Sequence, residues 1–152
     1  MNIVESSLKL KDLYFKELHF LQQKKINTAL RYLFDYDVYY NDEEHNDFNL
    51  KIKIEMEDEE KNIAIKAIAM ASFIYEGDQT AEIKDVIINE NSVAIVFPYI
   101  RAQITILTAQ PGINPVMFPI MNIGETIKRQ KEFDSKRKET IKKIDKIVES
   151  KE

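Results

Sequence analysis

The chain has 152 residues, of which 44% are hydrophobic and 32% charged, and its formal net charge is −4. This length and composition are typical of one soluble globular domain, here residues 1–152, and they exclude a disordered chain. No apolar run approaches the roughly 20 residues that span a bilayer, and the absence of cysteine excludes disulfides, thiolate nucleophiles and thiolate metal ligands.

The charge is unevenly distributed along the chain. Residues 1–124 hold 12 Lys and Arg against 19 Asp and Glu, a net charge of −7, whereas residues 125–152 hold 10 against 7, a net charge of +3. An acidic body argues against nucleic-acid binding, because phosphate contacts need a positive surface. The N-terminus "MNIVESSLKLKDLYF" lacks the basic start and apolar block of a secretory signal, so we expect a cytoplasmic protein without membrane insertion.

The first strand-like segment, "LKLKDLYFKELHF" at Leu8–Phe20, changes phase along its length. Its apolar residues lie on one face as far as Leu10, on the opposite face at Leu13, and on the first face again at Leu18. This pattern indicates either a β-bulge near Lys11–Asp12 or a strand that is buried on both faces.

Three further segments alternate with the period of a β-strand. They are Leu30–Tyr40, Phe48–Glu57 and Asn62–Glu76, separated by acidic turns. Phe48–Glu57 has the clearest pattern, with apolar and charged residues on opposite faces, as in a half-buried antiparallel strand. The third segment has only alanines on the middle of one face, which indicates that a helix packs closely there. Long strand edges favour association unless they are covered or paired, so we expect an oligomer.

Helical patterns begin after Gly77. Thr80 resembles an N-cap, with Glu82 in the first turn of the helix. Pro98 then lies within a helical pattern, which predicts a kink or a first-turn position, and "QPG" at Gln110–Gly112 predicts the end of this helix. A second, charged helix is expected over about 124–150.

The expected fold is therefore α+β: a four-stranded antiparallel sheet, a long helix, an extended proline-bearing apolar segment and a C-terminal helix. With three glycines in the chain, neither a dinucleotide-binding loop nor a P-loop is present. His45 lies in the acidic stretch Asn41–Asp47, but the spacing fits neither an EF-hand nor a tetrahedral zinc site, and a solvated hairpin turn is expected. We therefore expect no enzyme activity, no metal and no cofactor.

Two sequence phrases carry further information. One is "FPYIR" at Phe97–Arg101, followed by a helix end near glycine and a proline-bearing apolar segment that closes on "PIMNI" at Pro119–Ile123. The other is "LYFKELHF" at Leu13–Phe20. Both resemble phrases of the SecB family of protein-export chaperones, the second being similar to the family's first-strand phrase. The two phrases cover about 35 residues, and the expected order of elements agrees with the family along the rest of the chain.

The resemblance implies a cytoplasmic tetramer, a dimer of dimers, that holds unfolded preproteins in long apolar grooves without nucleotide or metal chemistry. Many family members deliver these clients to the SecA motor of the translocase. The function that the resemblance implies is an ATP-independent holdase that keeps polypeptides competent for translocation. The alternative is a dedicated chaperone of one client, such as an antitoxin, and a small enzyme or ligand-binding domain has no support in the residues.

The resemblance also implies roles for particular residues. Extended, apolar and methionine-bearing segments suit the binding of many different clients. The expected client-binding residues are Tyr36, Phe97, Val116, Met117, Phe118, Ile120, Met121 and Ile123. The expected oligomer-interface residues are Tyr14, Tyr99, Arg101 and Ile104.

Two departures from the family bear on docking to the SecA motor. Glu17 keeps an acidic residue at one docking position of the outer sheet face, but Lys66 stands where an acidic residue is usual. The short acidic tail of the family is replaced by the net-basic "KRKETIKKIDKIVESKE". Both differences argue against direct delivery to the translocase.

Overall fold

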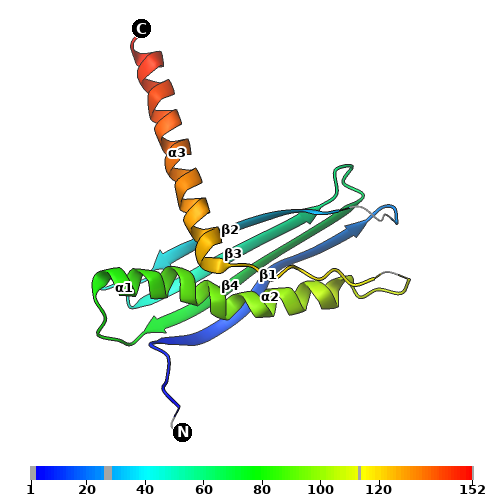
Figure 1. Ribbon diagram of the computed structural model, residues 1–152, viewed down its shortest axis with the longest axis horizontal. Helices are drawn as coiled ribbons and strands as arrows, with labels where there is room; N and C mark the ends of the chain where they lie inside the picture. Colours follow the sequence, from blue (N-terminus) through cyan, green and yellow to red (C-terminus); the bar gives the residue numbers. More distant parts are fainter. Residues whose placement is uncertain (1–2, 26–28, 113, 152) are drawn as a thin grey trace. The chain divides into compact units, whose positions relative to one another are not determined.

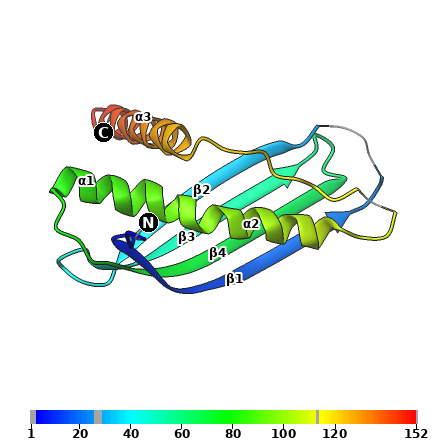
Figure 2. The ribbon, with the colours of Figure 1, turned by 60° about the horizontal axis from the view of Figure 1, so that its bottom comes forward.

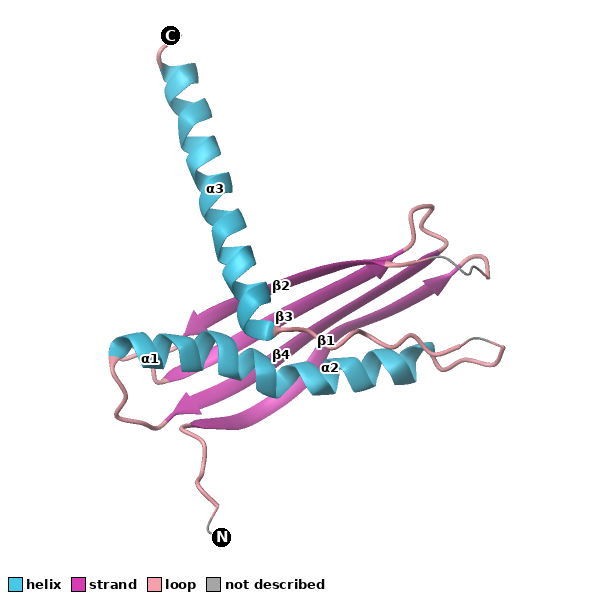
Figure 3. Ribbon diagram, in the orientation of Figure 1, coloured by secondary structure: helices cyan, strands magenta, loops and turns pink. Residues whose placement is uncertain are grey.

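A computed structural model describes residues 3–25, 29–112 and 114–151 of the chain (Figure 1). Strands precede helices along the sequence. Figure 3 distinguishes the strands, in magenta, from the helices, in cyan. The elements are β1 (Leu8–Gln22), β2 (Arg31–Tyr40), β3 (Asp47–Glu57), β4 (Ile63–Tyr75), α1 (Ala81–Val86), the π-helical turn η1 (Ile87–Asn91), α2 (Ser92–Thr108) and α3 (Ile123–Glu149). The predicted α+β class and the order of its elements are confirmed.

The four strands form one antiparallel sheet in the order β1-β4-β3-β2. The central pair, β3 and β4, alternates between buried and partly exposed residues, because one face of the sheet lies under α2 (Figure 2). The core side chains that β3 and β4 supply to this helix-covered face are Phe48, Leu50, Ile52, Ile54, Met56, Ile65, Ala67, Ala69, Ala71 and Phe73.

The three central alanines of β4, at positions 67, 69 and 71, are almost completely buried. Helix α2 packs on β4, so the prediction that a helix lies close to these small side chains is confirmed. A methyl group leaves room for the larger apolar side chains of α2, such as Val96 and Ile100, which are buried as well.

Strand β1 contains two register shifts relative to β4, one between Leu10 and Asp12 and one between Phe15 and Glu17. The first shift is a bulge at Lys11–Asp12, one of the two alternatives that the sequence left open, and the second, at Lys16, was not predicted. Each extra residue switches the following side chains to the opposite face of the sheet. Together the two shifts bring the apolar residues from all three parts of β1 onto the helix-covered face. The residues aligned in this way are Leu8, Leu10, Leu13, Phe15, Leu18 and Phe20.

The segment that covers the sheet begins as predicted. The Thr80 hydroxyl accepts a hydrogen bond from the backbone N–H of Ile83 at the start of α1. Pro98 lies inside α2 and not in its first turn. The helix ends at Thr108, and Gly112 follows with φ of +76°, a left-handed conformation that favours glycine.

The described chain divides into two compact units, Met1–Pro119 and Ile120–Glu152. The second unit contains α3, whose N-cap Asn122 accepts a hydrogen bond from Glu125 N at 3.1 Å. The bounds of α3 agree with the predicted helix over 124–150. Within the described residues, no helix combines the length and apolar character needed to cross a membrane.

Candidate client-binding surface

Residues 114–119, here called the anchored segment, run alongside α2 without regular secondary structure (Figure 2). Three side chains of α2 hold the backbone of this segment. Arg101 Nε donates to Phe118 O at 3.1 Å, and the Thr105 hydroxyl lies 3.3 Å from Val116 O. The Thr108 hydroxyl accepts from Val116 N at 2.7 Å. The prolines keep the segment extended, and these contacts stand in for the pairing that a strand would provide.

Phe118 is only 4% exposed and closes an aromatic cluster. Its ring meets Phe97 of α2 edge-on at a centroid distance of 5.3 Å, and Tyr32 of β2 edge-on at 5.2 Å. Edge-to-face contacts of this kind add to the stabilisation that burial provides. The neighbouring Met117 is 71% exposed. The anchored segment therefore alternates between a side chain in the core and one at the surface.

Edge strand β2 presents an aromatic stripe on the helix-covered side of the sheet. Helix α2 packs on β1, β3 and β4, and the side chains of β2 on this face remain partly exposed. This set, here called the β2 stripe, is Tyr32, Phe34, Tyr36, Val38 and Tyr40. The contact between Tyr32 and Phe118 joins the stripe to the anchored segment. We take the stripe and the exposed Met117 of the segment joined to it as the candidate client-binding surface.

The opposite face of β2 is charged. Asp35 and Asp37 stand opposite Lys53 and Lys51 of β3, and Arg31 pairs with Glu57 at 3.0 Å. The one tyrosine on this face, Tyr39, has its pKa raised by burial and by the carboxylates of Asp37 and Asp35. The two faces of the same strand thus differ sharply in chemistry, and the helix-covered side alone carries a continuous apolar row.

The predicted client-binding residues fall into three environments. Tyr36 lies in the β2 stripe, and Met117 is fully at the surface. Phe97 and Phe118 are buried, and Val116 is partly buried with its backbone held by α2. The remaining three belong to the second unit, where Ile120 is exposed and Met121 and Ile123 are partly exposed. Among the eight, the structure shows the rings of Phe97 and Phe118 in contact.

The predicted oligomer-interface residues are also divided. Tyr14, on the outer sheet face opposite Met70, and Tyr99 on α2 are both exposed. Arg101 anchors Phe118 O, a role that sequence reasoning missed. Ile104, in contrast, is fully buried within its own protomer, because it lies on the face of α2 that packs in the core.

Sequence reasoning also missed Thr105 and Thr108. A signal for them exists: Arg101, Thr105 and Thr108 follow at spacings of four and three, which places them on one face of a helix. A polar row of this kind, on an otherwise apolar helix before a proline-bearing segment, is typical of side chains that bind backbone groups.

Glu17, the predicted docking acid, forms an ion pair with Lys66 on the adjacent strand. Lys66 Nζ lies 3.1 Å from Glu17 Oε1, and both side chains are partly exposed. The positive charge of Lys66 therefore offsets the negative charge of Glu17. This pairing leaves little negative charge at the position for a basic partner.

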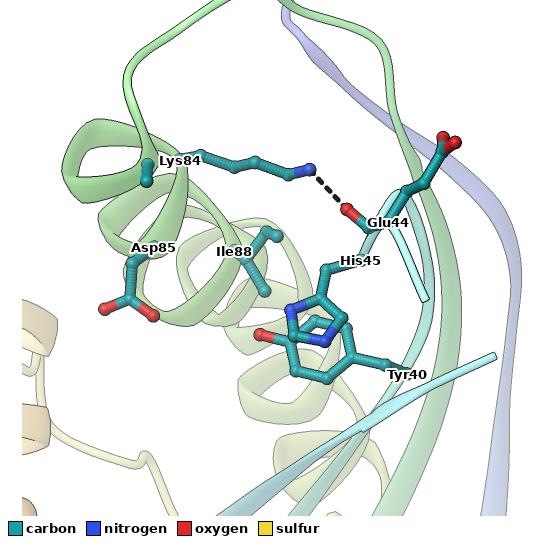
Figure 4. Close-up of a pocket in the computed structure, with 7 residues that line it drawn as sticks. Tyr40, Glu44, His45, Lys84, Asp85 and Ile88 are labelled. Atoms are coloured by element: carbon teal, nitrogen blue, oxygen red, sulfur yellow. Dashed lines mark hydrogen bonds between the residues drawn. The ribbon is translucent and has the colours of Figure 1, made fainter. Parts of the chain in front are cut away.

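A cavity of about 210 Å³ lies between α1 and the β2–β3 turn (Figure 4). Lys84 Nζ fastens the turn by donating to Glu44 O at 2.8 Å and to Asn46 Oδ1 at 2.6 Å. The ring of His45 stacks on Tyr40 at 3.8 Å. Burial, and then the charge of Asp85, raises the pKa of Tyr40.

These contacts give His45 a packing role in the turn. Across residues 3–25, 29–112 and 114–151, no three His, Cys, Asp or Glu side chains gather as a metal site would require.

Comparison with known proteins supports the fold assignment. No protein-family profile matches the sequence. An uncharacterised protein of Methanocaldococcus jannaschii, MJ0357, is 29% identical over 144 residues, covering 88% of this chain and 93% of that protein. Among solved structures, the SecB-like chaperone Rv1957 of Mycobacterium tuberculosis, bound to a ChAD peptide of the HigA1 antitoxin, is similar. It superimposes with a TM-score of 0.56 at 18% identity over 75% of this chain and 90% of that one.

A protein of unknown function from Streptococcus agalactiae superimposes with a TM-score of 0.48 at 9% identity, covering 74% of this chain and 97% of that chain. The likeness to the mycobacterial protein shows that the chain has a SecB-like fold. The resemblance drawn from the two sequence phrases is confirmed at the level of the fold.

Proposed function

We propose that the protein is an ATP-independent holdase chaperone that binds unfolded polypeptides on the candidate client-binding surface. The observation that carries this proposal is the exposed aromatic row of edge strand β2, joined through Phe118 to the anchored segment and its exposed Met117. An unfolded polypeptide offers scattered apolar side chains and extended backbone. A long apolar surface on a sheet edge matches both.

Aggregation of a denatured client tests the proposal. The protein, added in stoichiometric amounts and without nucleotide, is expected to suppress the light scattering of several chemically unfolded proteins on dilution. If scattering of all these clients is unchanged at a several-fold excess of the protein, the holdase proposal fails.

Two tyrosines of β2 provide a matched pair for mapping the surface. Tyr32 and Tyr39 are 47% and 48% exposed and lie on opposite faces of the same strand. Tyr32→Asp is expected to weaken suppression at least fivefold, since a charge in the β2 stripe must be desolvated when an apolar client binds. Tyr39→Asp is expected to have little effect. Equal effects of the two substitutions would contradict the placement of the client on the helix-covered side.

A dedicated chaperone of a single client is the second candidate. It is favoured by the Glu17–Lys66 ion pair, which argues against docking to the translocase motor. The antitoxin peptide seen bound to the mycobacterial SecB-like protein supports it as well. A panel of unrelated unfolded proteins separates the two candidates, because suppression of many clients supports the general holdase and suppression of one supports the dedicated chaperone.

A further inference from the structure

The anchored segment contains three consecutive apolar residues, Val116, Met117 and Phe118, between Pro115 and Pro119. In an extended chain successive side chains point in opposite directions, so either Met117 or Phe118 faces outward, but not both. Burial of apolar area alone distinguishes poorly between them, because both side chains are large and apolar. Another interaction must decide which of them reaches the surface.

We propose that Arg101, Thr105 and Thr108 are positioning residues that fix the register of the anchored segment and so present Met117 to a client. All three contact backbone atoms of Val116 or Phe118, the residues on either side of Met117. Because they bind backbone groups, they hold whichever residue lies at this point whatever its side chain, and only the N–H that Thr108 accepts from excludes a residue type, namely proline. Only the link to a client rests on the proposed chaperone function; the register itself does not.

The buried Thr108 makes the most selective of the three contacts. Its hydroxyl lies 2.9 Å from Ile104 O, to which it donates, and this orients a lone pair toward Val116 N at 2.7 Å. A shift of the chain that placed residue 115 at this point would bring proline, which has no N–H to donate. The Thr108 acceptor would then be left buried without a partner, which is unfavourable.

The opposite shift is disfavoured by Pro119. It would place Pro119 where Phe118 now packs between Phe97 and Tyr32, and the aromatic cluster would lose its central ring. The polar row of α2 and the two prolines therefore select one register, in which Met117 is outside.

The absence of native cysteine allows this register to be read by thiol labelling. Single Met117→Cys and Phe118→Cys proteins are treated with a thiol-reactive dye under native conditions. The first is expected to react at least tenfold faster than the second. In a Thr108→Val background, which keeps the size of the side chain but removes the hydroxyl, this ratio is expected to fall at least threefold. Thr108→Ser is expected to restore it.

An unchanged ratio in Thr108→Val overturns the proposal, provided that circular dichroism shows a folded protein. Should Thr108→Val not fold, Arg101→Lys serves instead. Lysine keeps the charge but lacks the fixed Nε–H donor, so the ratio is again expected to fall, and an unchanged ratio again overturns the proposal. Neither result depends on a client, so failure of the register and failure of the holdase function are distinguishable.

The link to the client is tested with the Thr108 variants without an introduced cysteine. Met117→Asp, which places a charge at the exposed position, is expected to weaken suppression of client aggregation. Thr108→Val is expected to weaken it to about the same extent, while Thr108→Ser behaves as the unsubstituted protein. Full suppression by a Thr108→Val protein whose labelling ratio has fallen would overturn the claim that the register serves client binding. In that case the register assignment itself would still hold.

Discussion

Met117 and Phe118 are neighbours in the chain, but at the scale of single residues they have different physical roles. The ring of Phe118 is surrounded by Phe97 and Tyr32, whereas the side chain of Met117 is in water. Sequence reasoning assigned both to the client surface, because both are apolar and follow the same helix. Burial distinguishes the two residues: Phe118 contributes to the stability of the fold, and Met117 is accessible for binding.

Phe118→Ala is therefore expected to lower the free energy of unfolding by about 3–5 kcal/mol, through lost burial and the cavity left behind. Met117→Ala is the matched control and is expected to change it by less than about 0.5 kcal/mol, as is usual for exposed positions. Urea unfolding followed by circular dichroism measures both. A similar cost for the two substitutions would contradict the register described above.

Asp58, in the β3–β4 turn, provides a pH-dependent contribution to stability. Burial alone would raise its pKa, but hydrogen bonds from Ile63 N, the Asn62 side chain and the backbone outweigh this and lower the pKa from its ordinary value of 3.8. A lowered pKa in the folded state means that the carboxylate stabilises the fold at pH values above 3.8. This stabilisation is lost as the pH falls from about 5 through 3.8 to the lowered pKa.

Asp58→Asn removes this titration. The urea midpoint of the variant is expected to depend less on pH between about 5 and 3 than that of the unsubstituted protein, and to be lower at pH 7. Asp12, an exposed aspartate of β1, provides the control substitution. Parallel pH profiles for the Asp58→Asn protein and the unsubstituted protein would contradict this role.

At the scale of elements, β1 depends on its two bulges. The bulges place the apolar residues of three successive parts of the strand on one face. The number of residues between these parts therefore matters as much as which residues they are. The sequence showed that the apolar residues of β1 change face. It did not show whether bulges correct this change, because a strand buried on both faces gives the same pattern. Only the position of α2, on one side of the sheet, distinguishes the two possibilities.

Deletion of Lys16 is expected to be strongly destabilising, because it turns either Leu18 and Phe20 or the residues before the second bulge toward the outer face. Lys16→Ala keeps the residue count and is expected to cost less than about 1 kcal/mol. Urea midpoints of the two variants make the comparison. If the deletion is tolerated as well as the substitution, the second bulge has no role in aligning the strand.

At the scale of the whole molecule, self-association remains a prediction. Tyr99 and Ile106 are exposed large apolar side chains seven residues apart, and therefore on the same outward side of α2. Such a stripe on the helix that covers the sheet favours burial against a second copy. Because Ile104 is in the core, the interface proposed here consists of Tyr99 and Ile106, with Tyr14 as a separate contact on the outer sheet face.

Sedimentation equilibrium is expected to give a mass that is a multiple of the 17.9 kDa chain. Tyr99→Asp combined with Ile106→Asp is expected to shift the protein toward the monomer, because two charges would be desolvated at the interface. Leu33→Asp, on the outer face of β2, is the control and is expected to leave the mass unchanged. A monomeric unsubstituted protein would rule out the oligomer.

The sequence by itself determined the α+β class, the four strands, the Thr80 cap and the C-terminal helix. These features depend on local periodicity and capping, which the order of residues records directly. The tertiary structure decided which residues of the proline-bearing segment are buried, that Ile104 belongs to the core, and that Lys66 neutralises Glu17. These outcomes depend on contacts between distant parts of the chain. The sequence pattern of an apolar residue is the same whether the residue faces the core or a client.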